Sequence, residues 1–133
     1  MRVPLKKITD LVGFVARSEE VCLESVDIAV VTSAEMARMN RRYLRHRGAT
    51  DVLSFDLTDS GDDGISAQIV VCGEWAVREA RARDHGQQQE LLLYIVHGLL
   101  HLMGYDDSSK RKASKMVSRQ EELLYAFLEG QRH

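Results

Sequence analysis

The sequence predicts a single α+β domain in which a small mixed β-sheet is covered by helices. The chain has 133 residues, the length of one ordinary domain, and no linker or internal repeat divides residues 1–133. The expected elements run helix, strand, helix, strand, strand and then helices. This order differs from the regular strand–helix alternation of a doubly wound parallel sheet.

Each element is predicted from its own pattern. Apolar residues at helical spacing predict the helices, and short β-branched runs predict the strands. Thr32 to Glu35 has the form of a capping box that opens a helix, and Gly104 suits the end of another. The helices are expected over residues 3–17, 32–45, 73–83, 87–103 and 108–128, and the strands over residues 26–31, 51–57 and 65–72.

Composition excludes several classes of protein. Apolar residues make up 44% of the chain and charged residues 29%, which excludes intrinsic disorder. The longest apolar run, near residues 91–96, is far shorter than the ~20 residues of a membrane span. No signal-peptide pattern occurs in the first twenty residues, and the isolated Cys22 and Cys72 suit buried reduced thiols, so we expect a cytoplasmic protein. A formal net charge of −2 argues against nucleic-acid binding through bulk charge.

The helix over residues 87–103 carries the clearest chemical signal. Its surface is apolar nearly all round, except for a narrow polar stripe of Glu90, Tyr94, His97 and His101. Two imidazoles four residues apart on a buried helix converge on one point, and a divalent metal satisfies both. Hydrogen bonds to carbonyl or carboxylate groups are the alternative, but the following Gly-Tyr-Asp-Asp favours a metal.

A third ligand is expected just beyond Gly104. Asp106 and Asp107 are the candidates, since a carboxylate is an acceptable zinc ligand. Three protein ligands leave one position open, as in catalytic zinc sites. Gly98 stands where the zinc peptidase motif HExxH has its glutamate base, so peptidase activity is not expected.

A basic stripe is predicted on the helix that begins near Thr32. Its arginines recur at positions i, i+3, i+4 and i+7, and a further arginine follows: Arg38, Arg41, Arg42, Arg45 and Arg47. Such a stripe is either a solvated helix face or a surface that binds phosphates. We expect RNA to bind at this face, beside the metal site. We also expect salt to weaken this binding.

Two sequence blocks resemble one protein family. HGLLHLMGYDD, residues 97–107, closely resembles the signature HGxLHLxGYDH of the YbeY family of bacterial endoribonucleases. Asn40, Tyr43 and the run TDVLSF at residues 50–55 look like the family's NxxYR and TDVLSF segments. The resemblance implies a zincin-like fold, one zinc ion per chain and cleavage of single-stranded RNA. It also implies a role in ribosomal RNA maturation at the 3′ end of the small-subunit RNA, with the small ribosomal subunit as partner.

The resemblance also implies site residues. It places the metal ligands at His97, His101 and Asp107, which would act through a metal-activated water. With Leu44 in place of a family arginine, the missing charge would have to come from Arg45, His46 or Arg47, and we assign Arg45 to the catalytic site. No membrane contact and no DNA specificity are expected.

Three positions depart from the family pattern. Asp107 replaces a third histidine, Leu44 replaces the arginine after the tyrosine, and Ala67-Gln68 replaces a Gly-Asp pair. These departures motivate an alternative, a ribosome- or RNA-binding factor of the same fold that has lost cleavage. A metal-dependent hydrolase of small substrates would follow from an open metal site alone.

Overall fold

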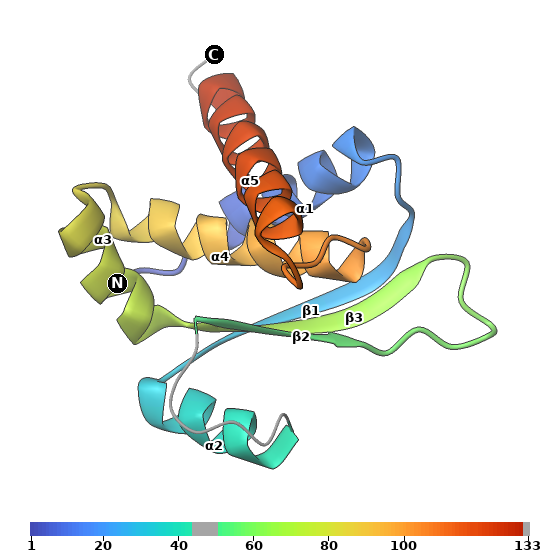
Figure 1. The fold of residues 1–133 in the computed structure, drawn as a ribbon, viewed down its shortest axis with the longest axis horizontal. Helices are drawn as coiled ribbons and strands as arrows, with labels where there is room; N and C mark the ends of the chain where they lie inside the picture. Colours follow the sequence, from blue (N-terminus) through green and yellow to red (C-terminus); the bar gives the residue numbers. More distant parts are fainter. Residues whose placement is uncertain (44–50, 132–133) are drawn as a thin grey trace.

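The computed structural model describes residues 1–43 and 51–131 and contains each predicted element in the predicted order (Figure 1). The helices are α1 (Leu5–Ser18), α2 (Ser33–Tyr43), α3 (Gly73–Arg83), α4 (Gln87–Leu102) and α5 (Lys110–Gln131), and the strands are β1 (Leu23–Val31), β2 (Val52–Asp56) and β3 (Ile65–Cys72). β1 begins at Leu23 rather than at Val26. The added residues include the exposed Glu24 and Ser25, which lack the apolar signal of a strand.

The strands form the small mixed sheet that the sequence predicts. Their order is β1-β3-β2, with β1 parallel and β2 antiparallel to the central β3. Val71 of β3 pairs with Val30 of β1 and with Val52 of β2. β2 is therefore an edge strand of the described sheet.

The two faces of the sheet are covered by different helices, because successive strand residues point to opposite faces. Ile69 and Val71 join the large core formed with α1, α4 and α5. Val70 and Cys72 instead contact the smaller cluster around Met36 of α2. Figure 1 shows α2 alone on one side of the sheet, with α1, α4 and α5 on the other.

The start of α2 follows the predicted cap. The Glu35 backbone N–H donates to Thr32 Oγ1 at 3.2 Å, and the Met36 N–H donates to the Thr32 carbonyl at 2.9 Å. Met36 is fully buried against the sheet, whereas Arg38 and Arg41 are exposed. The arginines of the predicted stripe are thus exposed within the described part of this helix, and the opposite side packs on the sheet.

Two further expectations concern cysteines and membranes. Both cysteines are free, but Cys22 is exposed and only Cys72 is buried, so the expectation of two buried thiols was wrong for Cys22. Cys22 lies in the connection before β1, outside the packed core. Among the described residues, no helix has the length and apolar character that crossing a membrane requires.

Candidate functional site

α4 lies so close to the sheet that its sequence is constrained at Gly98. Ser54 Oγ of β2 donates a hydrogen bond to the Gly98 carbonyl at 3.1 Å. A Cβ atom at position 98 would lie 2.9 Å from Ser54 Oγ, 3.1 Å from Ile69 Cγ2 and 3.2 Å from Val52 Cγ2. Glycine is thus the residue that permits this approach. The same packing leaves no room at this position for the glutamate of an HExxH motif.

Two histidines of α4 converge one turn apart, as predicted. His101 Nε2 lies 3.1 Å from His97 Nε2, and the ring centroids are 4.7 Å apart in an edge-to-face arrangement. Both side chains are half-buried, so the pair has access to solvent from one side. The rest of the helix around them is packed into the core.

Gln120 of α5 fixes the orientation of the first histidine. His97 Nδ1 lies 2.8 Å from Gln120 Oε1, and because an amide oxygen only accepts, the ring N–H is on Nδ1. His97 Nε2, the other ring nitrogen, faces His101 Nε2. The sequence analysis missed Gln120, since no local pattern tells which residue of a distant helix meets a given histidine.

The donor chemistry of the pair fits a zinc ion. Two nitrogens bound to tetrahedral zinc at ~2.0–2.1 Å lie about 3.3 Å apart, close to the observed Nε2–Nε2 separation. A hydrogen bond from the other ring nitrogen to an oxygen is also the usual support of a zinc-bound histidine. Across residues 1–43 and 51–131, however, no three His, Cys, Asp or Glu side chains gather closely enough to hold a metal.

The two candidate aspartates in the turn after α4 have different surroundings. Gly104 has φ +104° and ends the helix as predicted, with the Tyr105 N–H bonded to the Leu100 carbonyl at 3.0 Å. Asp106 Oδ1 accepts from the Ser108 hydroxyl at 2.7 Å and from its backbone N–H at 3.0 Å. These bonds hold the pKa of Asp106 below its usual range. Asp107 is exposed.

At the other end of α4, Glu90 and Tyr94 of the predicted polar stripe belong to a different cluster of side chains. Glu90 is fully buried, where it contacts His85 and forms an ion pair with Arg83 Nη1 at 3.1 Å. Burial, and then the Glu90 charge, raises the pKa of the Tyr94 hydroxyl far above its usual value. The stripe therefore divides into a carboxylate cluster against α3 and a histidine pair against α5.

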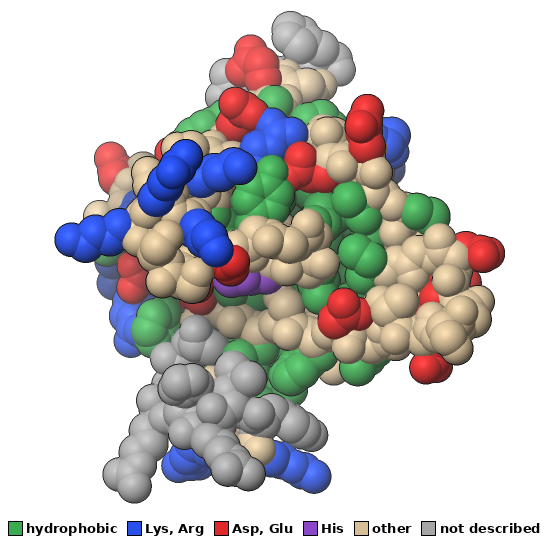
Figure 2. All heavy atoms as spheres, turned by 45° about the vertical axis from the view of Figure 1, so that its right-hand side comes forward, with side chains coloured by type: hydrophobic (Ala, Val, Ile, Leu, Met, Phe, Trp, Pro, Cys, Tyr) green, Lys and Arg blue, Asp and Glu red, His purple; other side chains and the backbone are tan. Residues whose placement is uncertain are grey.

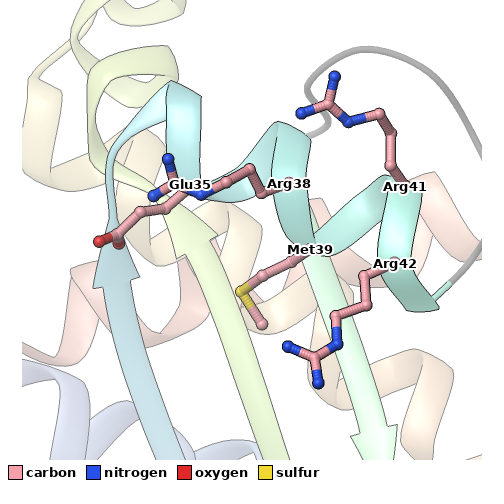
Figure 3. A pocket seen from close by; sticks show the side chains of 5 residues that line it. All are labelled: Glu35, Arg38, Met39, Arg41 and Arg42. Atoms are coloured by element: carbon pink, nitrogen blue, oxygen red, sulfur yellow. The ribbon is translucent and has the colours of Figure 1, made fainter.

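The described arginines of α2 lie on the opposite side of the sheet from the histidines (Figure 1). Figure 3 shows them around a pocket of about 610 Å³, with Met39 pointing toward the sheet and the side chains of Arg41 and Arg42 pointing away from each other. The expectation that this part of the stripe adjoins the histidine pair was wrong, because α2 and α4 cover different faces. The sequence pattern shows one helix's periodicity but not which face of a sheet the helix covers.

The remaining predicted positions are placed as follows. Leu44, Arg45 and Arg47 lie outside the described residues. Ala67 of β3 is buried, and Gln68 pairs with Phe55 of β2 across the sheet. Ala67 and Gln68 therefore lie within the central strand of the sheet.

The fold and site together define a class: a small α+β protein in which a buried helix, packed against a three-stranded mixed sheet, carries two converging histidines. Three comparisons place the chain within that class. The family model described as "Endoribonuclease YbeY" matches residues 4–128. The endoribonuclease YbeY of Macrococcus caseolyticus is 33% identical over 131 residues, covering 92% of this chain and 85% of the relative. That of Beutenbergia cavernae is 35% identical over 113 residues, covering 79% and 75%.

A solved structure agrees. The solution structure of TM1509 from Thermotoga maritima matches with a TM-score of 0.67 and 25% identity, covering 96% of this chain and 83% of that one. The chain belongs to the YbeY endoribonuclease family. The family and the fold class predicted from the sequence are thus confirmed.

Proposed function

We propose that this protein is a zinc-dependent endoribonuclease specific for single-stranded RNA, acting in the cytoplasm on the 3′ end of the small-subunit ribosomal RNA. Family membership supports RNA cleavage, since its relatives are named endoribonucleases. The observation that carries the zinc proposal is the convergence of two imidazole nitrogens at 3.1 Å, one of them oriented by Gln120.

We further propose His97, His101 and Asp107 as the zinc ligands. The two histidines already present their ring nitrogens to one point. Asp106 is held by Ser108, whereas Asp107 has no hydrogen bond or ion pair among the described residues and its carboxylate is exposed. This difference supports Asp107, the position that the family resemblance also implies, as the third ligand. When bound, zinc supplies a Lewis acid that polarises a phosphoryl oxygen and lowers the pKa of a water molecule.

The chain's own residues would then orient the reaction. Gln120 keeps the His97 proton on Nδ1, so that the Nε2 lone pair stays available to bind zinc. Gly98 holds the helix against β2 and supplies no side chain that could act as a base. Arginines bind phosphates bidentately, so we propose that Arg38, Arg41 and Arg42, with Arg45 and Arg47, contact RNA phosphates.

Cleavage of RNA by the purified protein tests this proposal. A short single-stranded RNA and its annealed duplex are incubated with the protein, with and without a chelator, and the chelated sample is then given zinc. We expect the single strand alone to be cut, loss of cleavage with chelator, and recovery with zinc. Equal cleavage of the duplex, or cleavage indifferent to chelator, would contradict the proposal.

One observation favours the second candidate function, an RNA-binding ribosome factor without cleavage. Asp107 stands where the family has a histidine, and no third ligand lies beside the histidine pair in the described structure. Co-sedimentation with small ribosomal subunits, combined with no cleavage in zinc-supplemented buffer, would support this candidate. Zinc-dependent cleavage would exclude it.

A further inference from the structure

The first turns of α5 carry an unusual charge. Four cations lie within six residues and are all exposed: Lys110, Arg111, Lys112 and Lys115, hereafter the α5 cationic segment. The first turn holds no acidic residue. Cations at this end of a helix are disfavoured by the helix dipole. Helix stability therefore does not account for these residues.

Ion pairs within the protein do not account for them either. Lys112 Nζ lies 3.6 Å from Asp106 Oδ2, but both side chains are about half exposed, at 59% and 47%. An exposed pair of this kind contributes little to stability. Within the described structure, no ion pair involves Lys110, Arg111 or Lys115. The segment thus presents net positive charge to solvent.

The position of this segment links it to the histidine pair. Lys112 and Lys115 line a pocket of about 340 Å³ whose other walls come from the turn that ends α4, namely Met103, Gly104, Tyr105 and Asp106. That turn begins two residues after His101. Further along the same helix, Gln120 bonds to His97. Figure 2 shows a group of Lys and Arg side chains with a histidine side chain at its lower edge.

We propose that the α5 cationic segment binds the phosphates of a single RNA strand, which runs from the histidine pair over the turn after α4. Lys112 and Lys115 are three residues apart, so they are neighbours on one face of the helix and can contact the same strand. This inference rests on the proposed function, because it takes RNA as the occupant. The reasons are the charge complementarity and the continuity with the proposed cleavage site.

The geometry also distinguishes this surface from the predicted one. The described arginines of α2 lie across the sheet, whereas the α5 cationic segment shares a face of the molecule with the histidines. The binding of RNA in a position for cleavage therefore depends more on α5 than on the described arginines of α2. The family resemblance and the sequence periodicity gave no indication of this segment.

The test compares two matched pairs of lysines. Lys112→Gln/Lys115→Gln removes two charges from the start of α5, and the control Lys6→Gln/Lys7→Gln removes two from the first turn of α1. Both pairs relieve the same kind of helix-dipole conflict. Binding of a fluorescent 2′-O-methyl oligouridine, which keeps every phosphate, is measured by anisotropy over a range of salt concentrations. Cleavage of the unmodified RNA is measured in parallel.

We expect only the α5 variant to lose affinity. Each phosphate contact on a single strand contributes about 0.7 to the slope of log K against log salt, so two lost contacts lower that slope by about 1.4. If the affinities converge near ~1 M salt, the deficit at ~0.1 M is about 25-fold. KM for cleavage should rise while kcat is retained, because these lysines bind RNA away from the reacting atoms.

The outcomes separate this inference from the proposed function. If the wild-type protein binds and cleaves RNA but the α5 variant matches it, the inference fails and the proposed function stands. An equal loss in the control variant would show a general charge effect and would also overturn the inference. If the wild-type protein neither binds nor cleaves RNA, the proposed function fails and takes the inference with it.

Discussion

Replacing Gly98 by alanine tests whether α4 depends on its close approach to the sheet. In a helix interior, alanine is favoured over glycine by about 1 kcal/mol. Here the new methyl group would lie 2.9 Å from Ser54 Oγ, 3.1 Å from Ile69 Cγ2 and 3.2 Å from Val52 Cγ2. Overpacking of this kind costs about 1–3 kcal/mol. Displacement of Ser54 also breaks its hydrogen bond to the Gly98 carbonyl, which costs about 1 kcal/mol more.

The net expectation is that Gly98→Ala lowers the free energy of unfolding by about 1–3 kcal/mol. Gly13→Ala in α1 is the matched control, because there the added methyl meets only atoms of the Arg17 guanidinium, at 3.1 Å and beyond, which can move. The control should be more stable than the wild type by about 0.5–1 kcal/mol. Urea unfolding of both variants measures the difference. A Gly98→Ala protein as stable as the control would refute the close-packing argument.

Three further perturbations have defined outcomes. Glu90→Gln should lower the free energy of unfolding by about 1–3 kcal/mol, since it weakens charge-assisted bonds to Arg83 and His85, which reach solvent and can rehydrate; an unchanged urea midpoint would contradict this. Tyr94 has a raised pKa, so above pH ~10 the unfolded chain holds fewer protons than the folded one and stability falls with rising pH, by up to about 1.4 kcal/mol per pH unit. Unfolding measured between pH ~8 and ~11 should show a shallower fall in Tyr94→Phe, and identical curves would argue against the assignment. Gln120→Ala should weaken zinc binding by about 10–100-fold. Gln120→Glu should bind zinc more tightly than Gln120→Ala, because its carboxylate still accepts the hydrogen bond from the imidazole N–H. Competition with a chromogenic chelator measures the zinc affinity of each variant, and affinities equal to that of the wild type would exclude the orienting role.

The elements of the fold could be predicted because their signals are local. The β-branched run at residues 26–31 of β1 and the apolar surface of α4 identify a strand and a buried helix without tertiary information. The first residues of β1 escaped prediction because Glu24 and Ser25 are exposed there and carry no apolar pattern. Strand order and the side of the sheet that α2 covers depend on long-range pairing, which periodicity does not contain.

The candidate site divides in the same way. His97 and His101 could be predicted to meet because a helix places residues four apart on one face. Gln120 could not, since its contact with His97 spans 23 residues of sequence. The union of Glu90 with His85 was missed for a related reason: their contact depends on how the turn between α3 and α4 folds back.

The most direct test of the account is the zinc content of the purified protein, measured by elemental analysis beside that of Asp107→Ala. The account predicts one zinc ion per wild-type chain and a clear loss of zinc in the variant, with Asp106→Ala as a matched control that retains it. A wild-type protein without stoichiometric zinc would contradict the metal centre. An Asp107→Ala protein that keeps its full zinc content would contradict the assignment of Asp107 as the third ligand.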